Sequence, residues 1–252
     1  MYTAMNFVKD DLFDEGRHTR GKVGFVLLSS EQTIEGDMFR LFPADVGLHF
    51  ARVSSADDIT VACLSSLTRE LTRSASTLLP DAGLDVVSYA CTSGSLVLGE
   101  DKVVDALRTG APKARPTSLI TSVIRALKAL EVSKIAVATP YLDEVNDREK
   151  NYLQDRGFEV TRICGLNLRY DSEMVRVRPE RIADFAKTVD TTDAEAVFIS
   201  CGALRSLDIV DELEQTLKKP VICSNQAMAW DILRLLGIRD RVAGYGTLMR
   251  SC

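Results

Sequence analysis

The sequence has few of the residues that build metal sites. Its 252 residues include two histidines, His18 and His49, and none of the six cysteines forms a C-x-x-C pair. Because structural zinc sites are built from closely spaced Cys and His ligands, we expect no metal centre of this kind. Cysteines without a disulfide pattern are typical of free thiols in a reducing compartment.

The chain also lacks the features of membrane, secreted, nucleic-acid-binding and nucleotide-binding proteins. No apolar run approaches the roughly 20 residues that span a bilayer, and the N-terminus has no apolar core of the signal-peptide kind. The net charge is -5 and no basic block is present, which argues against binding to phosphate backbones. Neither G-x-G-x-x-G nor G-x-x-x-x-G-K-[ST] follows a strand-like segment. We therefore expect a cytoplasmic protein without membrane, nucleic-acid or organic-cofactor partners.

What the sequence does contain is a regular alternation of apolar runs and helical patterns. Runs typical of buried strands lie at 21–30, 83–95, 133–141, 158–167, 194–203 and 220–226. Helical spacing is present at 58–79, 116–132, 144–157, 179–190, 207–219 and 227–238. The helix over 116–132 is expected to begin near Thr117 or Ser118, since both residue types favour helix starts. The alternation predicts an α/β protein with mostly parallel sheet, buried on both faces.

Two pairs of segments resemble each other at nearly equal offsets. KVGFVLLSS (22–30) resembles KIAVATPYL (134–142) at an offset of 112 residues, and DVVSYACTSGS (85–95) resembles EAVFISCGALR (195–205) at an offset of 110. Agreement between the offsets indicates an internal repeat. We therefore predict two Rossmann-like lobes with parallel sheets, related by a pseudo-twofold axis, with the active site in the cleft between them.

The repeat also suggests where the lobes begin and end. Lobe 1 is predicted to comprise residues 21–116 plus 222–252, and lobe 2 residues 117–221. The last segment would then pack back on the first lobe. Residues 1–20 lie outside the repeat and are interpreted as an N-terminal arm. Oligomeric state cannot be read from such a pattern.

Cys91 and Cys201 occupy matching places in the two copies. Each follows a strand, and ligands of open α/β sheets bind beyond the carboxyl ends of the strands, so both thiols should reach one cleft. Small and hydroxyl residues follow each cysteine, which lets backbone N–H groups approach an anion such as a carboxylate or enolate. A thiolate is both a base and a nucleophile. The pair therefore predicts either inversion by one acid and one base, or addition to a double bond followed by elimination.

Other residues have a structural interpretation that must be weighed against a functional one. A free cysteine is most often a small buried hydrophobe, and Cys63, Cys164 and Cys223 lie inside apolar runs and are interpreted that way. Tyr141 ends the strand that copies 22–30, which places it at the same cleft rim, although a half-buried aromatic is the plainer interpretation.

Four motifs resemble one known group of enzymes. YACTSGS (89–95), TPYLDEVN (139–146), ISCGALRSLDIVDELE (199–214) and KPVICSNQAMAW (219–230) are similar to the maleate isomerase and arylmalonate decarboxylase group. That group belongs to the aspartate/glutamate racemase superfamily, and the similarity is greatest to the ectoine-utilisation protein A branch. It covers roughly residues 20–250.

The resemblance implies a two-lobed fold, no metal or organic cofactor, and commonly a dimer or tetramer. It implies that Cys91 is the nucleophile that adds to an alkene and that Cys201 is the partner acid or base. Decarboxylases of the group have glycine at the first cysteine position, so both cysteines favour an isomerase or racemase. The resemblance further implies a substrate carboxylate bound by Thr92, Ser93, Tyr141, the Gly202 backbone and, in a looser alignment, Asn167.

The sequence departs from the group after the first strand. Maleate isomerases have Ser-Ser-Asn there, with the asparagine binding a carboxylate, whereas this chain has Ser29-Ser30-Glu31-Gln32. A carboxylate of Glu31 would repel a desolvated dianion, at a cost of several kcal/mol, but would accept hydrogen bonds from an ammonium or amide group. Alternatively, Glu31 turns outward and Gln32 takes its role; Ser30 remains a substrate-binding candidate in either case.

The leading hypothesis is a cofactor-independent isomerase of a small carboxylate, with maleate cis–trans isomerisation as the nearest activity. A racemase of an amino acid or N-acyl amino acid, with Cys91 and Cys201 as its two bases, is the first alternative. An arylmalonate-type decarboxylase and a non-catalytic cytosolic ligand-binding protein are the others, since a fold alone does not fix a function.

Overall fold

The computed structural model describes residues 12–251, and its eight strands form two parallel sheets. The strands are β1 (Gly21–Leu28), β2 (Val46–Val53), β3 (Val86–Tyr89), β4 (Arg115–Ser118), β5 (Lys134–Thr139), β6 (Glu159–Gly165), β7 (Ala196–Ile199) and β8 (Val221–Cys223). One sheet has the order β2-β1-β3-β4 and the other β6-β5-β7-β8. Each strand of the first sheet thus has a counterpart four strands later, and the predicted repeat of two α/β lobes is confirmed.

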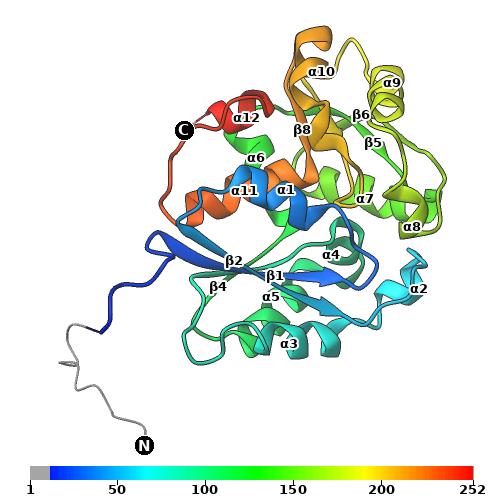
Figure 1. Cartoon of the computed structure of the whole chain (residues 1–252). Coiled ribbons are helices and arrows are strands. Elements are labelled where there is room, and N and C mark those ends of the chain that lie inside the picture. The colour runs from blue at the N-terminus through cyan, green and yellow to red at the C-terminus, as the bar shows by residue number, and fades with distance from the viewer. Residues whose placement is uncertain (1–11, 252) are drawn as a thin grey trace, which may run out of the picture.

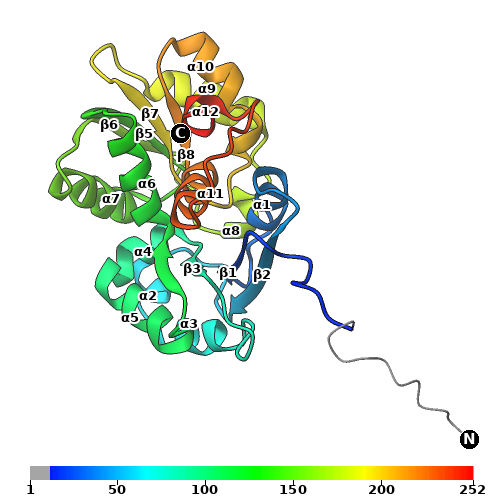
Figure 2. The same ribbon diagram turned by 90° about the vertical axis from the view of Figure 1, so that its left-hand side faces the viewer.

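Helices surround both sheets (Figures 1 and 2). They are α1 (Ile34–Leu41), α2 (Val61–Leu64), α3 (Thr68–Ser76), α4 (Thr92–Leu98), α5 (Glu100–Gly110), α6 (Leu119–Ala129), α7 (Asp143–Asp155), α8 (Asp171–Met174), α9 (Pro179–Val189), α10 (Val210–Leu217), α11 (Ser224–Leu235) and α12 (Gly246–Arg250), with a 3-10 turn at Ser206–Asp208. Figure 1 shows α1 and α11 between the two lobes, and both contact each other. No helix in residues 12–251 is long and apolar enough to cross a membrane.

Burial of the central strands explains why their sequences are continuously apolar. Strands β3, β7 and β8 are buried along their whole length, and β1 is buried from Val23 onward. Helices on both faces of a parallel sheet leave no face for polar residues. The resulting core runs through both lobes.

Several element boundaries differ from those that the sequence predicts. Strands β2 and β4 were not among the predicted strands: β2 is partly exposed and contains His49 and Arg52, and β4 has four residues. The helix predicted over 116–132 begins at Leu119, where Ser118 Oγ accepts a hydrogen bond from the Thr121 N–H at 3.3 Å. The strand predicted over 220–226 ends at Cys223, because Ser224 already begins α11.

The predicted lobe limits at 116 and 221 each fall inside a strand. Strand β4 completes the first sheet through Ser118, and β8 completes the second through Cys223. We therefore propose that the lobes meet just after these residues, with α11 in contact with both α1 and α6. The predicted arm, 1–20, lies outside the described residues up to residue 11; at its other end Arg20 forms an ion pair with Asp240 at 2.6 Å.

Candidate active site

Cys91 lies between β3 and α4 and caps the helix. Its Sγ accepts a hydrogen bond from the Gly94 N–H at 3.2 Å and lies 3.6 Å from Ser93 Oγ. The side chain is 8% exposed. The run of small residues after Cys91 allows this tight turn, so the thiol is fixed at the carboxyl end of the sheet.

Cys201 has the matching place after β7. Its backbone has φ +99°, a conformation that side-chain-bearing residues rarely adopt. Its N–H donates to Ser224 Oγ at 3.0 Å, and this same oxygen lies 3.0 Å from Thr92 Oγ1. Ser224 therefore connects the loop of Cys201 with the helix that Cys91 begins.

Both thiols line one cavity between the lobes. Its wall consists of Leu28, Glu31, Ile59, Ala90, Cys91, Thr92, Ser93, Tyr141, Asp171, Met174, Cys201, Gly202 and Ala203. The structure thus brings together seven of the nine predicted site residues. The free volume is about 10 Å³, near the minimum for one water molecule. A substrate therefore needs the walls to separate before it enters.

Two segments from different lobes close over this cavity. Ser172 donates from its N–H to Asp57 Oδ1 at 2.8 Å and from its hydroxyl to Oδ2 at 2.6 Å. Arg169 forms an ion pair with Asp58 at 2.6 Å. Ile59 and Asp171, which both line the cavity, adjoin these contacts and are held in place by them.

Burial makes the resting thiols poor acids. It raises the pKa of Cys91 to about 11, against smaller opposing effects of the Gly94 and Ser93 hydrogen bonds. Burial and the charge of Asp171 raise the pKa of Cys201 well above its ordinary value. The pKa of Tyr141 is also raised, first by burial and then by the charge of Cys201. At neutral pH all three groups are therefore protonated, and the tyrosine is a hydrogen-bond donor.

Glu31 faces the cavity and begins α1. Its Oε1 accepts hydrogen bonds from the backbone N–H groups of Thr33 and Ile34, and the side chain is 7% exposed. Burial and the charge of Asp171 raise the pKa of Glu31 to about 7. Gln32 is exposed and absent from the cavity wall. The alternative in which Glu31 turns outward and Gln32 takes its role is therefore wrong.

Two predicted residues do not reach the cavity wall. Ser30 donates its hydroxyl proton to Asp171 Oδ2 at 2.7 Å and so lies behind that carboxylate. Asn167 is exposed, because a left-handed φ of +61° turns the chain there while the neighbouring Leu168 N–H bonds to the Pro140 carbonyl. Asn167 is thus absent from the wall of the closed cavity.

Asp171 and Met174 are site residues that sequence reasoning missed. Asp171 begins α8 and is 4% exposed, and Met174 Sδ lies 4.0 Å from Cys201 Sγ. Both follow the loop that contains Asn167. The available signal was an acidic residue just after a strand, in the segment RYDSEM, at the end of the sheet that also presents Cys201.

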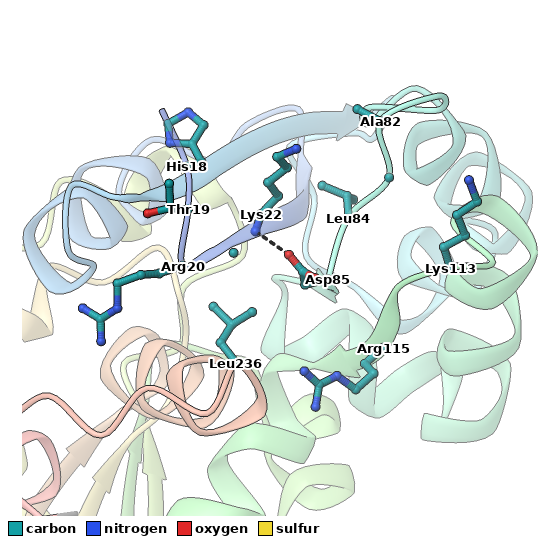
Figure 3. Close-up of a pocket in the computed structure, with 12 residues that line it drawn as sticks. His18, Thr19, Arg20, Lys22, Ala82, Leu84, Asp85, Lys113, Arg115 and Leu236 are labelled. Atoms are coloured by element: carbon teal, nitrogen blue, oxygen red, sulfur yellow. Dashed lines mark hydrogen bonds between the residues drawn. The ribbon is translucent and has the colours of Figure 1, made fainter. Parts of the chain in front are cut away.

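A larger cavity of about 490 Å³ lies elsewhere, at the opposite ends of the strands of the first lobe (Figure 3). Its wall includes His18, Lys22, Lys113 and Arg115, and Asp85 there accepts a hydrogen bond from the Lys22 N–H at 2.8 Å. It contains no cysteine and none of the predicted site residues. Among residues 12–251 no group of three or more Cys, His, Asp or Glu side chains is arranged to bind a metal ion.

The chain is therefore a two-lobed α/β protein in which each lobe contributes one cysteine to a shared cavity. Comparison with known proteins shows the family to which it belongs. The family model described as arylmalonate decarboxylase matches residues 37–249, and the chain belongs to this family.

The relatives include both activities known in the group. A maleate isomerase from Nocardia farcinica is 27% identical over 91% of this chain and 96% of its own length. An arylmalonate decarboxylase from Bordetella bronchiseptica is 33% identical over 68% of this chain and 73% of its own. A crystal structure of a mutant Nocardia farcinica maleate cis–trans isomerase with a covalently bound succinylcysteine intermediate has a TM-score of 0.84, at 26% identity over 91% of this chain and 98% of that one.

Proposed function

We propose that this chain is a cofactor-independent isomerase of a small carboxylate, in which Cys91 and Cys201 are the reacting groups. The observation that supports this most strongly is that equivalent residues of the two lobes line a single closed cavity. A closed cavity excludes water and strengthens every polar interaction inside it.

Two reactions suit the pair. In a cis–trans isomerisation, the Cys91 thiolate adds to one alkene carbon while the Cys201 thiol protonates the other. The new single bond rotates, the Cys201 thiolate takes the proton back, and the Cys91 thiolate leaves, which restores the double bond. In a racemisation, one thiolate removes the Cα proton and the other thiol donates its proton to the opposite face. Both reactions need one thiolate and one thiol, so one of the two resting thiols first releases its proton to solvent; neither reaction consumes a further reactant.

The polar groups of the cavity wall suit the substrate carboxylate. Thr92 and Ser93 present hydroxyls there, Tyr141 is a phenolic donor, and the Gly202 backbone completes the set. Asn225 supports this loop by donating to the Gly202 carbonyl at 2.8 Å. In this role, the donors would stabilise the negative charge that gathers on the carboxylate as the adjacent carbon is deprotonated or attacked.

The relatives support isomerisation of an alkene dicarboxylate as the first candidate, since maleate isomerases match nearly the whole chain. Racemisation is the second candidate. Both thiols line one cavity, as two acid–base groups on opposite sides of a carbon must, and Glu31 in the same wall would accept a hydrogen bond from an ammonium or amide group. Decarboxylation is less well supported, because the resemblance implies a glycine in the decarboxylases at the position of Cys91.

Proton NMR in D2O with a panel of carboxylates tests the proposal. The panel is maleate, phenylmalonate, and free and N-acetylated amino acids. Conversion of maleate to fumarate would establish cis–trans isomerisation, and loss of a Cα–H signal would establish racemisation. Release of CO2 from phenylmalonate, with no isomerisation of any other compound, would contradict the proposal.

We further propose a cytoplasmic homo-oligomer, a dimer or tetramer, of the ectoine-utilisation branch. Free cysteines support the reducing compartment. Phe39 is 67% exposed on α1 and packs on Phe50 of the edge strand β2, which supports a subunit contact at that face. Light scattering of the purified full chain measures the oligomeric state; a monomer at micromolar concentration would contradict this part of the proposal.

A further inference from the structure

The cavity between the thiols has an unusual balance of charge for a site that binds a carboxylate. Two acidic side chains, Glu31 and Asp171, line it, and no lysine, arginine or histidine of residues 12–251 does. Both acidic side chains are more than nine-tenths buried. A dicarboxylate placed here would bring its negative charges against these side chains without a compensating cation, and repulsion between desolvated like charges weakens binding.

Both carboxylates are fixed in place and keep capacity for a ligand. The two hydrogen bonds to Glu31 from Thr33 and Ile34 end on the same oxygen, Oε1. Asp171 Oδ2 accepts from Ser30, and its Oδ1 accepts no hydrogen bond from residues 12–251. None of these donors is a cation, so the negative charge of the pair is not neutralised within the protein.

Asp171 also changes the acidity of Glu31. The charge of Asp171 contributes to the raised pKa of Glu31, after burial. Burial also raises the pKa of Asp171, against its hydrogen bond from Ser30. A bound ammonium group would relieve both effects, because a positive charge beside a buried carboxyl favours its ionised form.

The other polar side chains of the wall are hydrogen-bond donors, whereas the carboxylates of Glu31 and Asp171 are acceptors. Thr92, Ser93 and Tyr141 are hydroxyl donors and come from other elements than Glu31 and Asp171. The wall thus offers donors for one anionic group and acceptors for one cationic group. A small zwitterion matches both, whereas a dicarboxylate matches only the donors.

We infer that the substrate is a small amino acid with a free ammonium group, and that Glu31 and Asp171 bind this group while the hydroxyl donors bind its carboxylate. This inference rests on the proposed function, in that both concern the same cavity. It makes Glu31 and Asp171 specificity-determining residues. Of the two reactions proposed above, it favours racemisation over isomerisation of an alkene dicarboxylate, and it leaves Cys91 and Cys201 as the groups that react.

Calorimetry of the full-length protein at pH 8 with near-isosteric probes tests the inference. The probes are 2-, 3- and 4-aminobutyrate, which are zwitterions, and succinate and maleate, which are dianions. We expect at least one aminobutyrate to bind 10-fold or more tightly than either dianion, since hydrogen bonds between two charged groups are stronger than neutral ones. Tighter binding of succinate or maleate, or no binding of any aminobutyrate, would overturn the inference.

Variants that keep shape and remove charge sharpen the test. Glu31→Gln retains an acceptor for the α1 N–H groups, and Asp171→Asn retains one for Ser30. Each should weaken aminobutyrate binding about 10-fold or more and improve that of succinate. Asp147→Asn, an exposed residue of α7, makes the same charge change elsewhere and should alter neither. Equal effects of all three variants would mean that only net charge matters and would overturn the inference.

The inference and the proposed function can fail separately. If aminobutyrates bind but the thiols are not needed for any conversion, the substrate class stands and the two-thiol isomerase does not. If the protein converts maleate through both thiols and Glu31→Gln leaves that rate unchanged, the isomerase stands and the zwitterion does not.

Discussion

Cys201 combines a reactive side chain with a backbone conformation that favours glycine. Its φ of +99° costs a residue with a Cβ about 1–3 kcal/mol, which the surrounding contacts must offset. We therefore expect Cys201→Gly to be about 1 kcal/mol or more stable than Cys201→Ala, since both lack the thiol and only one has a Cβ. Urea unfolding of the two variants measures the difference. Equal stabilities would show that the loop is not strained.

The charge of Glu31 should control ligand affinity as the pH changes. Groups that face it are Asp171 from α8 and Cys201 from the loop after β7, with Arg52 of β2 bonded to its backbone carbonyl rather than its carboxyl. Because its pKa is about 7, the carboxyl is neutral below that value and charged above it. Aminobutyrate affinity should thus rise between pH 6 and 8, and titration calorimetry at these pH values measures it. In Glu31→Gln the rise should be much smaller; an equal rise there would assign the titration to another group.

Among the site residues, the two cysteines could be predicted from the internal repeat, whereas Asp171 could not. Cys91 and Cys201 could be recognised because each follows a matching strand with small residues after it. Asp171 lies in a loop with no counterpart pattern, and only the folded chain brings it beside Ser30, which is 141 residues away in the sequence. Asn167 is absent from the wall of the closed cavity, and the left-handed turn there leaves no clear sequence signal at a non-glycine residue.

Helix α4 positions Cys91 through its contact with β3. Gly94 packs directly on the Tyr89 ring, and a Cβ at Gly94 would overlap with the tyrosine Oη. Gly94→Ala should therefore destabilise the protein by about 1–3 kcal/mol and shift the turn that holds the thiol. Gly36→Ala in α1 is the matched control, because no atom lies within 4 Å of its added Cβ; it should be neutral or stabilising. Thermal unfolding of both variants measures this, and similar losses in both would contradict the packing argument.

Element types could be predicted well from the sequence, and element ends less well. Strands β1, β5 and β7 are mostly apolar and stand in the middle of their sheets, so their burial is visible in the residues themselves. Strand β2 is an edge strand with polar residues, and β4 is short and begins with Arg-Pro, so neither has that pattern. Strands of this kind depend on pairing with a neighbour that the local sequence does not reveal, whereas the edge strands β6 and β8 are apolar enough to be predicted.

Buried acidic side chains make the stability of the whole molecule depend on pH. Glu149 of α7 is fully buried, and neither of its carboxyl oxygens has a hydrogen-bond partner among residues 12–251. Burial raises its pKa to about 7. An acid whose folded-state pKa exceeds its unfolded value binds more protons when folded, so stability falls as the pH rises from about 4.5 to 7. At about 1.4 kcal/mol per pKa unit, Glu149 alone costs a few kcal/mol above pH 7.

Glu149→Gln should remove that part of the pH dependence. We expect the variant to be more stable than the parent protein at pH 8, by a few kcal/mol, and to gain much less at pH 5, where Glu149 is already neutral. Asp147→Asn, at an exposed position two residues away on the same helix, should show no such change. Urea unfolding at the two pH values measures it. An equal effect of Glu149→Gln at both would mean that Glu149 keeps its charge state throughout.

The central claim is that both thiols act on one substrate, and single-thiol variants test it most directly. The measurement is the rate of conversion, by proton NMR in D2O, of whichever panel compound the protein transforms. Cys91→Ser and Cys201→Ser should each lower it about 10²–10⁴-fold, while Cys164→Ser, a partly buried cysteine of β6 outside the cavity, should stay close to the parent rate. Retention of the parent rate by either of the first two variants would contradict a two-thiol mechanism.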